Sequence, residues 1–162
     1  MRELPANHLD PKIKNVWRIS DGISISLTFA ILAIPVSLCV TFIAGAWAQL
    51  VMALYFVAYL VFMVIWIFVL PPIRYARWRY ELTPEYLDIA CGILWRRRTI
   101  VPFVRVQNTD TRQGPIMRVF GLASVTVSTA AGAHEIPGLS VEEAERVRDG
   151  AAEFARLARE DV

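Results

Sequence analysis

Charged side chains are absent from residues 22–73, which leaves an uncharged run of 52 residues in the first half of the chain. Such a run is much longer than a soluble core helix requires, but it can hold two membrane crossings of roughly 20 residues each. We predict a short, uncharged turn at 45–49. The pattern predicts a transmembrane hairpin with antiparallel helices at 23–44 and 50–70.

Individual residues refine this hairpin. Asp21 is placed to cap the first helix, because its carboxylate can accept a hydrogen bond from an otherwise unpaired backbone N–H. Pro35 predicts a kink within that helix, and Pro71-Pro72 predicts the end of the second helix. Hydroxyl groups in the first span are tolerable in lipid if they donate to the helix backbone: Ser24, Ser26, Thr28, Ser37 and Thr41.

Basic residues on both flanks of the hairpin predict its orientation. They precede the first span and follow the second: Lys12, Lys14, Arg18, Arg74, Arg77 and Arg79. The connecting turn carries no charge, so the positive-inside rule places both flanks in the cytoplasm. We therefore expect a multi-pass protein of the bacterial inner (plasma) membrane with both termini cytoplasmic.

Residues 1–21 form the expected cytoplasmic N-terminal segment. Two interpretations of it stay open, a short interfacial turn from Lys12 with Trp17 near the headgroups, or an unstructured tail. The small residues 44–46 also resemble a signal-peptide cleavage site. The apolar run before them exceeds the ~7–15 residues typical of such signals, so we favour an uncleaved span.

Alternation with a period of two replaces the continuous apolar run in the segment 74–162. Six short runs typical of β-strands are separated by turn signals: 80–82, 86–90, 93–101, 103–111, 123–128 and 134–137. In the fourth run, the alternation places Val104 and Val106 toward a core. Residues 116–120 favour a short helical turn ended by Gly121.

A C-terminal helix is predicted at 140–159. Ser140 and Glu143 form a capping box, with a serine at the cap and a glutamate three residues later. Apolar residues recur at spacings of three and four and form one stripe: Val141, Ala144, Val147, Ala151, Phe154 and Ala158. The segment 74–162 therefore reads as an α+β domain, a bent sheet or small barrel closed by an amphipathic helix.

Several short motifs occur in a specific order along the chain. They are RWRYELT at 77–83, GILWRRR at 92–98, RVQN at 105–108, QGP at 113–115, FGLA at 120–123 and IPGL at 136–139. Together with the hairpin, over residues 12–158, they resemble the membrane-flanked, YdbS-like family of bacterial PH-like domain proteins. The resemblance implies a PH-like bent barrel of seven strands with a C-terminal helix, one strand more than the alternation indicates.

Composition supports a membrane protein and offers little chemistry. The 162 residues are 56% hydrophobic, with a mean hydropathy of +0.43 and a net charge of +2. His8 and His134 are the only histidines, and Cys39 and Cys91 lie far apart in the sequence. No nucleophile elbow, phosphate-binding loop or CxxC pair occurs. We predict a protein that is not an enzyme and that uses no cofactor or metal.

Basic residues are the remaining candidates for a site. Arg74, Arg77, Trp78 and Arg79 follow the second span, where they can contact lipid headgroups or simply fix topology. Arg96, Arg97 and Arg98 lie on a predicted strand that faces either the bilayer or solvent, and the sequence leaves this choice open. The small net charge argues against nucleic acid as a partner.

Three hypotheses for function follow. The first is a scaffold or accessory subunit of a membrane complex, whose cytoplasmic domain binds a protein partner such as another PH-like membrane protein. The second is recognition of anionic lipid at the inner leaflet. The third is an oligomeric transport or permeation component, although no charge within 22–73 marks a path for ions.

Overall fold

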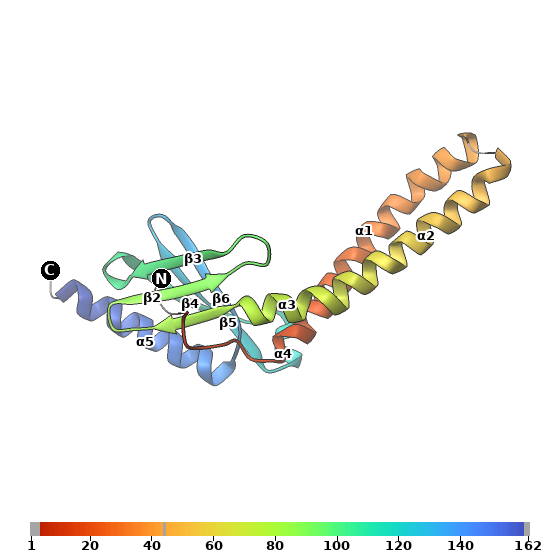
Figure 1. Cartoon of the computed structure of the whole chain (residues 1–162). Helices are drawn as coiled ribbons and strands as arrows, with labels where there is room; N and C mark the ends of the chain where they lie inside the picture. The colour runs from red at the N-terminus through yellow and green to blue at the C-terminus, as the bar shows by residue number, and fades with distance from the viewer. Residues whose placement is uncertain (1–3, 44, 161–162) are drawn as a thin grey trace. The chain divides into compact units, whose positions relative to one another are not determined.

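A computed structural model describes residues 4–43 and 45–160, which separate into two compact units. One unit, Trp17–Pro72, is a helical hairpin. The other combines the residues up to Val16 with those from Ile73 onward, and it is an α+β domain (Figure 1).

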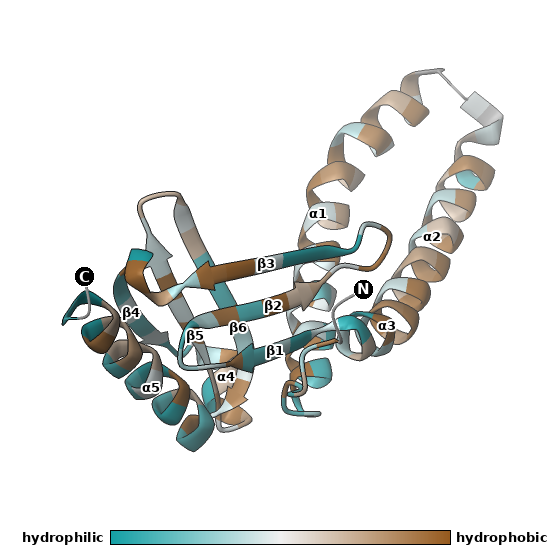
Figure 2. Ribbon diagram, turned by 60° about the vertical axis from the view of Figure 1, so that its left-hand side comes forward, coloured by the Kyte–Doolittle hydropathy of each residue, from teal (hydrophilic) through white to brown (hydrophobic). Residues whose placement is uncertain are grey.

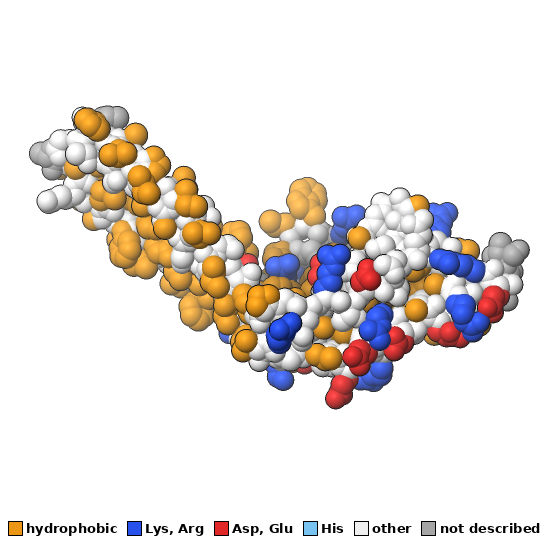
Figure 3. All heavy atoms as spheres, turned by 180° about the vertical axis from the view of Figure 1, so that it is seen from behind, with side chains coloured by type: hydrophobic (Ala, Val, Ile, Leu, Met, Phe, Trp, Pro, Cys, Tyr) orange, Lys and Arg blue, Asp and Glu red, His pale blue; other side chains and the backbone are white. Residues whose placement is uncertain are grey.

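The hairpin consists of two long helical stretches that run side by side. Its elements are α1 (Ile13–Ile43), the 3₁₀ turn η1 (Gly45–Trp47), α2 (Ala48–Val64), the π-helical segment η2 (Ile65–Val69) and α3 (Leu70–Arg77). The stretches Ile13–Phe42 and Ala48–Arg77 are long and apolar enough to cross a membrane. Most of their residues are hydrophobic (Figure 2). Their large hydrophobic side chains are mostly exposed, as lipid-facing side chains would be (Figure 3).

The first helix starts earlier than predicted, so the proposed cap at Asp21 is wrong. Helix α1 begins at Ile13, and Asp21 lies inside it. Asp10 takes the capping role instead, because its Oδ1 accepts a hydrogen bond from the Lys12 backbone N–H at 2.8 Å. Pro11 follows Asp10, a position where a missing N–H costs little. The predicted end of this span, Ala44, lies outside the described residues.

Pro71-Pro72 does not end the second helical stretch, contrary to prediction. Helix α3 continues through both prolines to Arg77. The π-helical turn η2 directly precedes them and interrupts the regular α-helical hydrogen-bond pattern. The backbone stays helical at Leu70, with φ −68° and ψ −47°, so the helical stretch continues although neither proline has an N–H to donate.

The prediction that hydroxyl groups in α1 bond the helix backbone is confirmed at three positions. Thr28, Ser37 and Thr41 donate to backbone carbonyls three or four residues earlier. Ser26 instead pairs with the Tyr59 hydroxyl of α2 at 3.0 Å. This bond, with aromatic stacking nearby, joins the two helices.

The domain consists of two antiparallel three-stranded sheets and a C-terminal helix, which confirms the predicted fold class. Sheet order is β1-β2-β3 and β4-β5-β6. The elements are β1 (Arg79–Leu82), β2 (Tyr86–Cys91), β3 (Arg97–Pro102), the 3₁₀ turn η3 (Phe103–Arg105), β4 (Val106–Arg112), α4 (Pro115–Val119), β5 (Leu122–Thr129), β6 (Gly132–Ser140) and α5 (Val141–Glu160). The implied seventh strand is not found among the described residues.

Two strand predictions need correction. Residues 93–96 form a loop, and β3 starts only at Arg97. Val104 is exposed, whereas Phe103 is fully buried, because the turn η3 shifts the alternation before β4 begins. The predicted helical turn at 116–120 is present as α4, and Gly121 follows it with a positive φ of 65°.

Helix α5 closes the domain as predicted. The Ser140 hydroxyl accepts a hydrogen bond from the Glu143 backbone N–H at 3.2 Å, which confirms the cap. One face of the helix is buried, at Ala144, Val147, Ala151 and Ala155. Phe154 packs against the core residue Phe103, with ring centroids 5.6 Å apart.

The N-terminal segment is part of this domain, which excludes the interpretation as an unstructured tail for residues 4–16. Asn7 pairs with Tyr80 through two backbone hydrogen bonds of 3.0 Å, at the edge of β1. The Asp10 backbone N–H donates to the Gly138 carbonyl at 2.9 Å. Leu9 and Ile13 are almost fully buried.

Candidate functional site

Five arginines surround one cavity of about 270 Å³ in the domain. They come from α3, β1, the end of the β2–β3 loop and β3: Arg77, Arg79, Arg96, Arg97 and Arg98. We call this cluster the arginine pocket. All five are candidates from the sequence, but no sequence pattern predicted that they would meet.

Strand register brings part of the pocket together. Ala90 of β2 lies opposite Arg79 of β1 on one side and Arg98 of β3 on the other. Residues that lie directly opposite in antiparallel strands share a face of the sheet. The two arginines are therefore on one face, with a small residue between them that leaves room for a cavity.

A tight turn returns the chain from β2 to β3 beside this cavity. Gly92 has a φ of 114°, and a Cβ there would clash with the Trp95 backbone carbonyl. Only glycine adopts this conformation readily. Arg77 then holds the loop from α3, since its guanidinium donates to the Ile93 carbonyl at 3.0 Å.

Arg98 differs from its neighbours because it has an internal partner. Its Nε lies 3.1 and 3.0 Å from the two Asp88 carboxylate oxygens, and its Nη2 lies 2.6 Å from Oδ2. The Asp88 residue is 1% exposed. The hydrogen bond to Asp88 raises the pKa of Arg98. This pair neutralises a buried carboxylate, so Arg98 has a structural role.

The remaining cations of the pocket are available to a ligand. Within the described part of the chain, no ion pair is found for these four, Arg77, Arg79, Arg96 and Arg97, and Arg77 donates to a backbone carbonyl. Uncompensated guanidinium groups around a cavity favour an anion with several oxygens, such as a phosphate.

Two of the predicted site residues lie outside the pocket. Arg74 and Trp78 do not line it, although both are close to it in sequence. Two apolar neighbours were missed by the sequence analysis: Leu94 and Trp95, at the tip of the β2–β3 loop, are 90% and 88% exposed. One sequence signal could have pointed to these two residues. The predicted strand 93–101 also carries three arginines, so it could not bury Leu94 and Trp95 while those arginines stayed in water.

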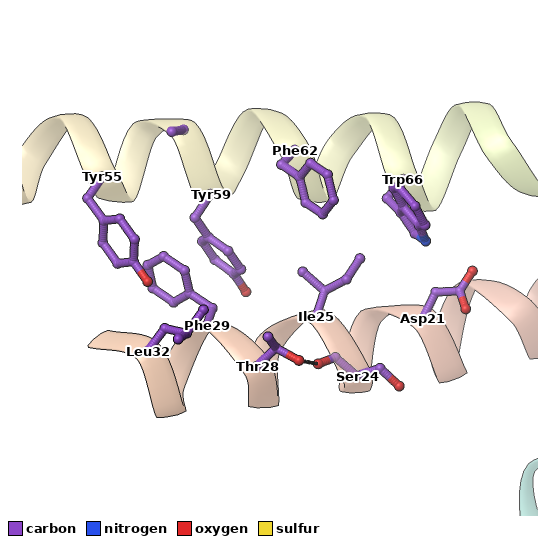
Figure 4. Close-up of a pocket in the computed structure, with 11 residues that line it drawn as sticks. Asp21, Ser24, Ile25, Thr28, Phe29, Leu32, Tyr55, Tyr59, Phe62 and Trp66 are labelled. Carbon is purple, nitrogen blue, oxygen red and sulfur yellow. Dashed lines mark hydrogen bonds between the residues drawn. The ribbon is translucent and has the colours of Figure 1, made fainter. Parts of the chain in front are cut away.

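The hairpin contains a second, different hollow. A groove of about 530 Å³ lies between α1 and α2, and Figure 4 shows its lining. Phe29 stacks against Tyr59 and Tyr55, with centroids 3.9 and 4.5 Å apart. Asp21 is the one charged residue among those that line the groove. The lining is otherwise mostly apolar and aromatic, which suits packing between helices.

Other polar groups of the domain have structural partners. The Tyr80 hydroxyl donates to Glu143 Oε1 at 3.3 Å. Burial, and then the nearby Glu143 carboxylate, raise the pKa of Tyr80 to about 12. His8 stacks on Tyr75 with centroids 6.2 Å apart. Among the described residues, no three His, Cys, Asp or Glu side chains gather as metal ligands would.

An apolar helical hairpin, followed by two three-stranded sheets and a closing helix, defines a membrane protein with a PH-like domain. Residues 23–155 match the family described as bacterial PH domain, and the chain belongs to that family. It is 37% identical over its full length to the full length of the UPF0699 transmembrane protein YdbS of Bacillus subtilis.

A second Bacillus subtilis protein is related over part of the chain. The UPF0699 transmembrane protein YdbT is 27% identical over 89 residues, which cover 52% of this chain and 18% of YdbT. No solved structure matches the chain. These similarities support the family and the membrane location, and they name no activity.

Proposed function

We propose that the protein is a membrane-anchored PH-like module that binds the anionic headgroups of inner-leaflet lipids through its arginine pocket. The observation that carries this proposal is the gathering of five arginines around one cavity, four of them without an ion-pair partner in the described residues. A lipid phosphate offers the oxygens that guanidinium groups bind in pairs.

The chain connection supports a lipid as the source of the phosphate. Arg77, which lines the pocket, lies only four residues beyond Ile73, the last residue of the uncharged run. A helix rises ~1.5 Å per residue, so ~6 Å of helix separates the two positions. The headgroup region on each side of a bilayer is ~5–8 Å thick, which puts Arg77 within reach of phosphates.

The test changes the two exposed arginines that have no structural partner. The double variant Arg96→Gln/Arg97→Gln, as the full chain in mild detergent, should retain phosphatidylglycerol less well than the unchanged protein in native mass spectrometry. Each basic residue near an anionic leaflet contributes ~1 kcal/mol, so we expect a roughly 10- to 30-fold weaker affinity.

A matched control separates the pocket from general charge. Arg112→Gln/Arg118→Gln removes the same charge from exposed positions on β4 and α4, outside the pocket. It should retain phosphatidylglycerol nearly as well as the unchanged protein. An equal loss in both double variants, or no loss in the first, would contradict the proposed headgroup site.

A second candidate function is the scaffold or accessory-subunit role. Strand β4 forms one edge of its sheet, and a groove of about 400 Å³ lies between that edge and α5. An exposed sheet edge can accept an extended segment of a partner as an added strand. The partial similarity to YdbT makes a related PH-like membrane protein a reasonable first partner to test.

Site-specific crosslinking tests this candidate. A photoreactive amino acid at Gln107, on the β4 edge, should crosslink to one partner at near-stoichiometric yield in cells. The same group at Glu145, on the exposed face of α5, is the control. Equal, diffuse crosslinking at both positions would argue against a scaffold that uses this edge. The permeation hypothesis has less support, since the hairpin groove is mostly apolar.

A further inference from the structure

The tip of the β2–β3 loop presents two large apolar side chains to the surroundings. Leu94 and Trp95 are more exposed than any other large hydrophobic residue of the domain in its described residues. Single exposed apolar residues are common on protein surfaces, but two adjacent ones at a loop tip suggest a contact. In Figure 2 the loop joins the hydrophilic start of β3, where the arginines lie.

Two local features fix the base of the loop that carries this tip. Gly92 makes the tight turn that only a glycine accepts, and the Arg77 guanidinium bonds the Ile93 carbonyl. Both constraints act at the base of the loop. Leu94 and Trp95 therefore lie exposed at the tip of a loop whose base is fixed, and they do not pack onto the core.

We infer that Leu94 and Trp95 insert into the interfacial layer of the cytoplasmic leaflet while the arginine pocket binds headgroups beside them. This inference rests on the proposed function, because the arginines provide the electrostatic part of the same contact. An apolar tip beside a cationic cluster matches an anionic membrane surface, which is apolar inside and negatively charged outside.

Depth and residue type favour lipid over a protein partner. Arg77 lies ~6 Å of helix beyond the uncharged run and contacts Ile93 directly, so the base of the loop is at headgroup level. Tryptophan prefers the interface between headgroups and acyl chains, because its ring is apolar and its N–H is polar. Leu94 supplies the purely apolar neighbour that would reach deeper.

The test measures the depth of the tip in a bilayer with the full chain. Leu94→Cys, in a Cys39→Ala/Cys91→Ser background, is labelled with an environment-sensitive fluorophore and placed in nanodiscs that contain phosphatidylglycerol. We expect blue-shifted emission and strong quenching by lipids that carry a spin label on the acyl chain. Val119→Cys, at an 82% exposed position on α4, is the control and should remain unquenched.

The outcomes separate insertion from headgroup binding. Absence of lipid quenching at position 94 overturns the inference. This holds if aqueous iodide quenches the label, which would show that it faces water. It also holds if iodide does not quench the label, which would show that protein covers it. Quenching at 94 but not at 119 supports it. The proposed function is judged separately by the Arg96→Gln/Arg97→Gln variant, which should lose phosphatidylglycerol preference.

An independent variant checks the energetic role of the tip. Leu94→Ser/Trp95→Ser should weaken retention of phosphatidylglycerol and of the zwitterionic phosphatidylcholine by a similar factor, because apolar insertion does not depend on headgroup charge. Retention unchanged for both lipids would overturn the inference while leaving headgroup binding intact.

Discussion

The three consecutive arginines at 96–98 have different roles, and this difference is visible only at the level of single contacts. Arg98 forms hydrogen bonds with the buried Asp88, whereas no ion pair is found for Arg96 or Arg97 among the described residues. The sequence could not predict this division, because Asp88 looked like an isolated carboxylate. Its partner lies ten residues away and is brought close by the β2–β3 register. Changing all three arginines together would therefore mix loss of folding with loss of binding.

Arg98→Gln should lower the thermal stability of the protein. Removing the guanidinium leaves the Asp88 carboxylate buried without its ionic partner, and an uncompensated buried charge is strongly destabilising. Arg97→Gln, one residue earlier, should leave the midpoint of thermal unfolding almost unchanged. Circular dichroism of the two variants in detergent measures this difference. Equal midpoints would mean that Asp88 is satisfied without Arg98.

Tyr80 predicts a loss of stability at alkaline pH. Its pKa is raised to about 12 in the folded domain, while an unfolded tyrosine titrates near ~10. The folded domain favours the neutral phenol of Tyr80. The neutral phenol therefore stabilises the folded state fully below pH ~10, and this contribution is lost as the pH rises toward 12. Tyr80→Phe cannot ionise there. Between pH 9.5 and 11.5, its unfolding midpoint should therefore fall less than that of the unchanged protein, and parallel curves would refute this assignment.

Among the elements, the N-terminal segment departs most from the sequence prediction. Its residues pack onto the edge of β1 and against β6, whereas the sequence left open a short interfacial turn or an unstructured tail. The packing depends on Gly138, which has a φ of 63° and lies where a Cβ would clash with the Ile13 side chain. The IPGL motif at 136–139, which contains Gly138, was recognised. Nothing in the sequence indicated that Ile13, 125 positions earlier, fills the space beside this glycine.

Gly138→Ala should destabilise the domain by about 3 kcal/mol, through the left-handed backbone and the overlap with Ile13. Gly121→Ala is a matched control, because Gly121 has a φ of 65° and open space around it. It should cost only ~1–2 kcal/mol. Denaturant unfolding in detergent gives both free energies.

A second substitution identifies the cause of the difference. Ile13→Ala alone should destabilise the domain, but in the Gly138→Ala background it should restore part of the lost stability, since the smaller side chain makes room for the new methyl group. Strictly additive effects would show that the N-terminal segment does not press on Gly138.

At the scale of the whole molecule, the sequence predicted the hairpin and the α+β domain, but it did not predict which residues of different elements come together. The hairpin followed from the absence of charge over 22–73, and the α+β domain followed from alternation and the Ser140 cap. The arginine pocket required the register of β1-β2-β3 and the turn at Gly92, which are long-range features of the fold. Its basic residues were visible in the sequence, but their convergence was not.

Topology links these parts to the proposed function. The basic flanks and the uncharged turn predict that both ends of the chain lie in the cytoplasm. A fluorescent protein that matures only in the cytoplasm should be bright when fused after residue 162. Alkaline phosphatase, which is active only outside, should be active when inserted in the turn at 45–47 and inactive at the C-terminus. Phosphatase activity at the C-terminus would place the domain outside. The arginine pocket would then face the outer leaflet, and the proposal of inner-leaflet headgroup binding would fail together with the predicted orientation.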